Sequence, residues 1–174
     1  GVGEYENRGW RIGGVRHTKG HISLANQPNQ IKSANGRYTG DYYFTVVHEM
    51  SHAFDFLQDE VSSEVEWAGL STWGADGLGT SKNFVTWYAP TSPSEDFAES
   101  MAYFILDPDT LLDKAPTKFE YISKNFFGGK KYDSRTLRAQ YDAVLGNLTG
   151  AARDAKIKDL RYNDYYACKI LPRP

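Results

Sequence analysis

The chain has 174 residues, the size of one ordinary domain, and a formal net charge of −2. Its 40% hydrophobic and 24% charged residues are typical of a soluble globular protein. The balanced charge argues against nucleic acid as a partner, and no apolar run approaches the ~20 residues that a membrane span needs. The single cysteine, Cys168, rules out an intrachain disulfide and a multi-cysteine zinc site.

Glycines and short apolar alternations dominate residues 1–40, which predicts a small twisted sheet with loops. Within this region, His21–Ala25 alternates in the manner of a half-buried strand. From Asp41 to about Glu60 the apolar residues follow a helical period instead. The buried stripe of that helix is expected to consist of Val46, Met50, Ala53 and Leu57.

A glycine-rich loop is expected over Gly69–Thr80, followed by a second helix over Ser92–Leu106. Ser92 is a plausible N-cap, and Pro93 suits the first helical position. Three more amphipathic helices are predicted, at Pro116–Phe127, Ser134–Leu148 and Gly150–Leu160. A sheet followed by helices predicts one α+β domain over residues 1–174, mostly helical in its second half.

The first predicted helix carries the motif HEMSH, which fits the HExxH pattern. Positions i and i+4 share a helix face, so His48 and His52 can direct two imidazole nitrogens at one tetrahedral Zn²⁺. Glu49 lies beside the pair and can take a proton from the attacking water. We expect one zinc ion per chain.

A catalytic zinc needs a third protein ligand, and the extended pattern HExxHxxGxxH is absent, because Asp55 and Gln58 occupy the positions of its Gly and final His. Glu95 and Glu99 share a face of the second helix, so one can bind zinc while the other accepts a hydrogen bond from a ligand histidine. The spacing alone does not decide between them. Glu95 can also be read as part of a capping box with Ser92.

Taken together, HEMSHAFD and the segment from Tyr88 to Glu99 resemble the gluzincin peptidases of the anthrax lethal factor and Pro-Pro endopeptidase type. The resemblance covers about residues 44–105 and implies a zincin-like core. It favours Glu95 as the third zinc ligand and leaves Glu99 beside a ligand histidine. It also implies that Tyr88, seven residues before Glu95, donates a hydrogen bond to the oxyanion, and Asp55 occupies the family's position three residues after the second histidine.

The same resemblance suggests how a substrate is held. A tryptophan upstream of the motif contacts substrate in Pro-Pro endopeptidases, and Trp10 is its candidate counterpart. A strand before the motif helix pairs with extended peptide in this class, which points to Ile22, Ser23 and Leu24. These expectations describe a monomeric zinc endopeptidase that acts on protein or peptide, secreted by a bacterium as a protease or as the catalytic domain of a toxin that enters a host cell.

Two other functions fit parts of the pattern. A catalytically silent pseudo-peptidase would keep the fold as a binding or toxin-delivery module. A deformylase also uses HExxH, but it takes its third ligand from a cysteine before the motif, whereas Cys168 lies far behind it.

Overall fold

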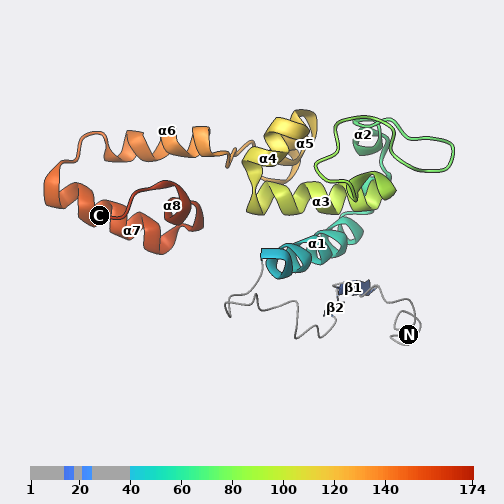
Figure 1. The fold of residues 1–174 in the computed structure, drawn as a ribbon, viewed down its shortest axis with the longest axis horizontal. Coiled ribbons are helices and arrows are strands. Elements are labelled where there is room, and N and C mark those ends of the chain that lie inside the picture. Colours follow the sequence, from blue (N-terminus) through green and yellow to red (C-terminus); the bar gives the residue numbers. More distant parts are fainter. Residues whose placement is uncertain (1–13, 18–20, 25–39) are drawn as a thin grey trace.

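The computed structural model describes residues 14–17, 21–24 and 40–174, with side chains from Phe44 onward. This part of the chain forms eight α-helices, two short 3-10 turns and one hairpin (Figure 1). The helices are α1 (Gly40–Leu57), α2 (Val65–Ala68), α3 (Pro93–Leu106), α4 (Pro108–Lys114), α5 (Pro116–Phe126), α6 (Ser134–Leu145), α7 (Gly150–Asn163) and α8 (Tyr165–Ile170). The 3-10 turns are η2 (Val61–Ser63) and η3 (Ala89–Thr91), and the strands are β1 (Gly14–His17) and β2 (His21–Leu24).

The hairpin is the only extended pairing of named strands among the described residues. β1 and β2 run antiparallel, with Val15 opposite Ser23 and Arg16 opposite Ile22, and the pair lies beside α1 (Figure 1). The prediction of an α+β fold is therefore wrong: the described residues form an all-α fold accompanied by one four-residue ladder. Alternation over four or five residues correctly indicates a short strand, but it carries no information about further strands beside it.

All five predicted helices are confirmed, with ends that shift by no more than three residues. Ser92 caps α3 by accepting a hydrogen bond from the Glu95 amide at 3.1 Å, and Pro93 opens the helix, as its fixed φ allows. The segment 69–80 is a loop, closed by a single bridge between Trp73 and Gly79. The helices α2, α4 and α8 were missed because each has only four to seven residues, too few to show a helical period.

Helix α3 lies at the centre of the described structure, between α1 on one side and α4 and α5 on the other (Figure 1). Phe97 and Phe104 of α3 are fully buried, in a cluster with Trp67 of α2 and Phe119 of α5. The Trp67 and Phe97 rings meet edge to face with centroids 5.0 Å apart, an arrangement that aromatic pairs prefer. This aromatic cluster fixes α3 as the support for the residues on its other face.

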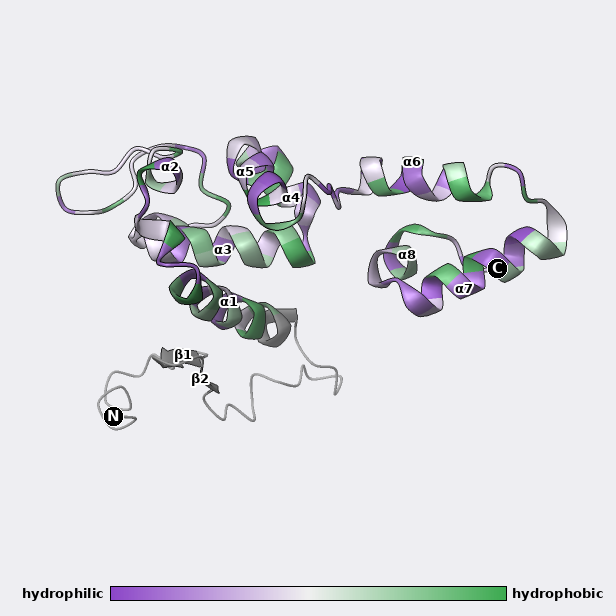
Figure 2. Ribbon diagram, turned by 180° about the vertical axis from the view of Figure 1, so that it is seen from behind, coloured by the Kyte–Doolittle hydropathy of each residue, from purple (hydrophilic) through white to green (hydrophobic). Residues whose placement is uncertain are grey.

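The last three helices pack around a second hydrophobic cluster. Leu137, Tyr141 and Leu145 of α6 contribute to it together with Ile157 of α7 and Ala167 of α8. Figure 2 shows hydrophobic residues along α1 and α3 and a larger hydrophilic share on α7. Among the described residues, no helix combines the length and the apolar character that crossing a membrane requires.

The buried stripe predicted for α1 is partly wrong. Ala53 is buried, but Met50 and Leu57 have 54% and 65% of their surface exposed. The buried face carries His48 and His52 instead, because α3 covers the polar side of α1. Hydrophobic periodicity identifies an apolar stripe but cannot tell which side of a helix its neighbour will cover.

Candidate metal site

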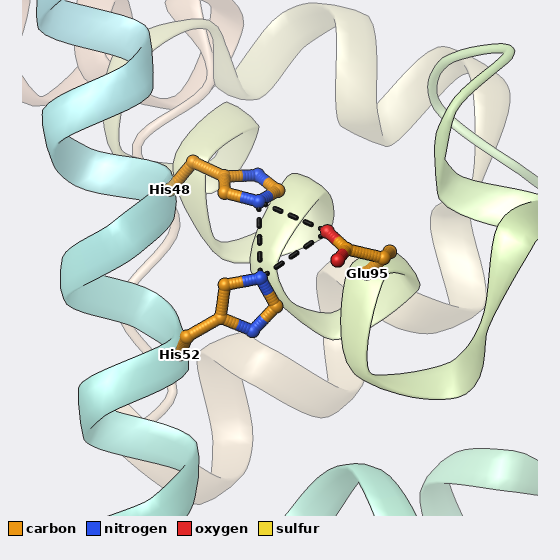
Figure 3. Close-up of side chains that lie close together, drawn as sticks. All are labelled: His48, His52 and Glu95. Atoms are coloured by element: carbon orange, nitrogen blue, oxygen red, sulfur yellow. Dashed lines mark hydrogen bonds and ion pairs between the residues drawn. The ribbon is translucent and has the colours of Figure 1, made fainter. Parts of the chain in front are cut away.

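Helix α1 positions the two motif histidines at its interface with α3. His48 and His52 are one turn apart and both buried, and their side chains point at α3 (Figure 3). Helix α3 supplies Glu95 from its first turn, where the positive end of the helix dipole favours a carboxylate. The sequence therefore brings together three polar side chains that belong to two packed helices.

The three donor atoms form a small triangle. Nε2 of His48 and Nε2 of His52 are 3.1 Å apart, and Glu95 Oε2 lies 3.0 Å from the first and 3.2 Å from the second (Figure 3). Ligands placed about 2.0–2.1 Å from a tetrahedral zinc are separated by about 3.3 Å. Two imidazoles and one carboxylate at this spacing fit zinc with one position left over, which is the arrangement of catalytic zinc sites.

The outer nitrogen of each histidine also has a neighbour. His48 Nδ1 lies 2.9 Å from Glu99 Oε1, and His52 Nδ1 lies 3.1 Å from Ser94 Oγ. An imidazole that binds a metal through Nε2 carries its proton on Nδ1, so Glu99 and Ser94 stand where acceptors for these protons are needed. Both rings have Nε2 toward Glu95 and Nδ1 toward one of these two residues.

The charges in the cluster are strongly coupled. Burial alone would lower the pKa of His48, but hydrogen bonds and charges from Glu95 and Glu99 outweigh it and raise that pKa to about 9. Burial alone would raise the pKa of Glu95, but hydrogen bonds and charges from His48 and His52 outweigh it and lower that pKa to about 2. A proton on His48 therefore competes with a metal ion for the same nitrogen.

Glu49 and Tyr88 lie at the same cluster. Glu49 is buried, and the Tyr88 ring centroid is 6.2 Å from that of His48. Burial, followed by the charge and hydrogen bond of Glu95 and a further charge effect of Glu49, raises the pKa of Tyr88 to about 12. The Tyr88 hydroxyl consequently keeps its proton at neutral pH and can act as a hydrogen-bond donor.

The capping-box interpretation of Glu95 agrees with the position of its backbone amide but not with the position of its carboxylate. Ser92 Oγ accepts the hydrogen bond from the Glu95 amide, as a capping box requires. The Glu95 carboxylate, however, lies against the two histidines. The same residue thus contributes its backbone to the helix cap and its side chain to the cluster.

Asp55 is buried and holds the turn that follows α1. Its Oδ1 accepts the Ser62 amide at 2.8 Å, and its Oδ2 accepts the Ser62 hydroxyl at 2.6 Å. The turn contains Asp59 and Glu60, both in the left-handed region at φ 58° and 60°. Asp55 compensates for that unfavourable backbone by anchoring η2 immediately behind it.

The expected substrate-binding residues belong to the N-terminal part of the chain. Ile22, Ser23 and Leu24 lie on β2, which pairs with β1 and runs beside α1. Trp10 lies outside the described residues.

Three polar residues around the site were not predicted from the sequence. Ser94 faces His52, and Asp96 and Lys118 form a fully buried ion pair with Lys118 Nζ 2.7 Å from Asp96 Oδ1. Burial raises the pKa of Asp96 to about 6 and lowers the pKa of Lys118. One signal for Lys118 was present: it stands four residues before Ile122 and eight before Phe126, on the apolar face of its helix.

Comparison of the chain with protein-family models, curated proteins and solved structures found no match.

Proposed function

We propose that the chain is a zinc-dependent endopeptidase of the gluzincin type, in which His48, His52 and Glu95 hold the metal. The observation that carries this proposal is the triangle of two histidine nitrogens and one carboxylate oxygen, with sides of 3.0–3.2 Å, beside a buried glutamate. When bound, zinc supplies Lewis-acid chemistry, activating water and polarising a carbonyl oxygen. The likeness of HEMSHAFD and the Tyr88–Glu99 segment to gluzincins supports the same reaction.

In this proposal Glu49 is the general base. Its place directly after His48 on the buried side of α1 is the place of the base in HExxH enzymes. Glu49 takes the proton of the attacking water and later delivers it to the leaving amine, so that one carboxylate serves both halves of the hydrolysis.

Tyr88 is the proposed donor to the oxyanion that forms at the scissile carbonyl. With its pKa near 12, the phenol stays protonated, and a donor that acts only once charge has developed lowers the barrier of the chemical step. The extended substrate would pair with β2, whose Ile22, Ser23 and Leu24 precede the motif helix. Secretion by a bacterium, as a protease or a toxin component, belongs to the same proposal.

The test combines metal analysis with cleavage of a quenched-fluorescent peptide library. The wild-type chain should bind one zinc and cleave peptide, and His48→Ala should lose the metal. Glu49→Gln should keep the zinc and lose about 10²–10⁴-fold in turnover. Glu64→Gln, an equal change at an exposed glutamate, is the matched control and should behave as wild type.

Each failure has its own meaning. A wild-type chain that binds no zinc would overturn the proposal as a whole. A chain that binds stoichiometric zinc yet cleaves no peptide, with His48→Ala losing the metal, would identify the pseudo-peptidase instead.

A further inference from the structure

A buried lysine outside the metal cluster connects the elements that build the site. Lys118 of α5 is fully buried, and its Nζ donates to Asp96 Oδ1 at 2.7 Å and to the Asn83 carbonyl at 2.8 Å. The same ammonium lies 4.1 Å from the centroid of the Phe84 ring. Lys118 thus contacts both Asp96, the residue after Glu95 on α3, and the loop that leads to Tyr88.

The loop next to the site carries two aromatic side chains that are not fully buried. Trp87 has 84% of its surface exposed and Tyr88 has 38%. Val85 and Ala89, on either side of them, are fully buried, and Asn83 lies two residues before Val85. The position of the Tyr88 hydroxyl therefore depends on the buried residues on either side of it as well as on its own partly buried ring.

A charged pair buried in an aromatic cluster is costly unless its geometry is well satisfied. The Lys118 ammonium donates one hydrogen bond to a carboxylate and one to a carbonyl, and it also lies over a ring face at a distance typical of a cation–π contact. An apolar side chain could fill the same volume but could not hold the Asn83 carbonyl. The chemistry of this position therefore points to a specific connection rather than to packing alone.

We propose that Lys118 is a positioning residue that acts through Tyr88: together with Asp96 it fixes the loop 83–89 on α3, so that the Tyr88 hydroxyl is held at the reacting carbonyl. The expected effect on kcat rests on the proposed peptidase function. The anchoring of the loop 83–89 by Lys118 does not depend on metal or turnover.

The variant that tests the inference removes both charges together, because Lys118→Met alone would leave Asp96 buried without its partner. The double replacement Lys118→Met with Asp96→Leu keeps the interior apolar and filled while removing the bond to the Asn83 carbonyl. Lys124→Met is the matched control, since it removes an exposed lysine from the same helix.

Kinetics distinguish positioning from a general structural role. The double replacement should lower kcat by about 10–100-fold with KM and zinc content nearly unchanged, the scale expected when a reacting group is misplaced. In a Tyr88→Phe background the same replacement should cost less than about twofold, because the hydroxyl it positions is already gone. An equal loss of kcat in both backgrounds, or loss of zinc, would overturn the inference.

Amide hydrogen exchange on the metal-free protein supplies a readout without turnover. The amides of Tyr88 and Ala89 in this loop, and of Gly79, Thr80 and Thr91 beside it, are hydrogen-bonded within the segment 72–91, and the double replacement should speed their exchange by about tenfold or more. Amides of α7 should be unaffected, and so should the loop in Lys124→Met. Unchanged loop exchange would overturn the inference even if the chain proves to be an active peptidase. Faster exchange in a chain without peptidase activity would refute the proposed function while leaving the anchor intact.

Discussion

The two helical parts of the molecule bury different kinds of side chain. In the interface between α1 and α3, the buried residues include His48, Glu49, His52 and Glu99. From residue 134 to the end, the buried residues are Leu137, Tyr141, Leu145, Ile157, Ala167 and Leu171, all apolar or aromatic. Buried ionisable groups lower stability unless something repays their desolvation, and active sites are where they gather. Under the proposed function, chemistry belongs to α1 and α3, and α6–α8 contribute stability.

The largest expected effect separates the two glutamates of α3. Glu95→Ala removes one corner of the donor triangle and should abolish stoichiometric zinc binding. Glu99→Ala leaves the triangle intact but frees the His48 ring, so it should weaken zinc affinity by about 10–100-fold. Titration with a zinc-competing chelator measures both. The reverse order of severity would exchange their roles, and the exposed Glu66→Ala should leave affinity unchanged.

A core truncation in α6 should affect stability alone. Leu145 is fully buried, so Leu145→Ala should lower the free energy of unfolding by about 2–5 kcal/mol. Zinc affinity and kcat, measured below the melting temperature, should stay within twofold of wild type. Its neighbour Val144 is 50% exposed, and Val144→Ala should change stability by less than about 0.5 kcal/mol. A specific loss of zinc in the Leu145 variant would break the division between the two parts.

Removing the Tyr88 hydroxyl tests whether a change beside the α1–α3 interface affects turnover without affecting stability. Tyr88→Phe should reduce kcat by about 10²-fold, or about 2.7 kcal/mol, with little change in KM, zinc content or stability. Tyr121→Phe, a partly buried tyrosine in the aromatic cluster, is the control and should turn over normally. If Tyr88→Phe retains kcat within a few-fold of wild type, the donor lies elsewhere. Tyr103→Phe is then the variant to examine, since Tyr103 also faces the charge of Glu99.

The metal-free protein should carry a pH signature of the cluster. A His48 pKa raised from 6.5 to about 9 stabilises the folded state fully below pH 6.5, and that contribution is lost as pH rises through 9. A Glu95 pKa lowered from 4.5 to about 2 contributes above pH 4.5 and is lost as pH falls through 2. The two statements describe one interaction, so the stabilisation should be counted once and should be greatest between pH 4.5 and 6.5, on the order of a few kcal/mol. Melting temperatures of chelator-treated wild type and His48→Ala should differ most in that window, and a pH-independent difference would contradict the coupling.

The smallest effect belongs to a polar contact of the C-terminal helices. The Tyr141 hydroxyl donates to Asp164 Oδ2 at 2.7 Å, and Tyr141→Phe should cost about 1 kcal/mol of stability. Denaturant unfolding measures it, with Tyr162→Phe as control because Tyr162 is 88% exposed. A change in peptide cleavage in Tyr141→Phe would show that α6 communicates with the site.

Local patterns predicted the helices well and the fold class poorly. HExxH spacing places His48 and His52 on one face wherever the helix packs, and the Ser92–Pro93 cap marks the start of α3. The partners of these residues depend on tertiary contacts that no local period encodes. Ser94 meets His52 across 42 positions of sequence, and Lys118 reaches Asn83 across 35. Such contacts become visible only when α1, α3 and α5 are packed together.

Helix α3 has a carboxylate at its positive, N-terminal end and hydrogen-bond donors at its negative, C-terminal end. Glu95 stands in the first turn, while at the last turn Lys169 Nζ donates to the Leu106 carbonyl at 3.1 Å and the Tyr166 hydroxyl donates to the Ile105 carbonyl. A helix of 14 residues is about 21 Å long. Lys169 and Tyr166 therefore contact the negative, C-terminal end of the α3 dipole, far from the two histidines. Removing residues 165–174 would leave these two carbonyls to water, and α3 would then fray first at its C-terminal end, the end opposite Glu95.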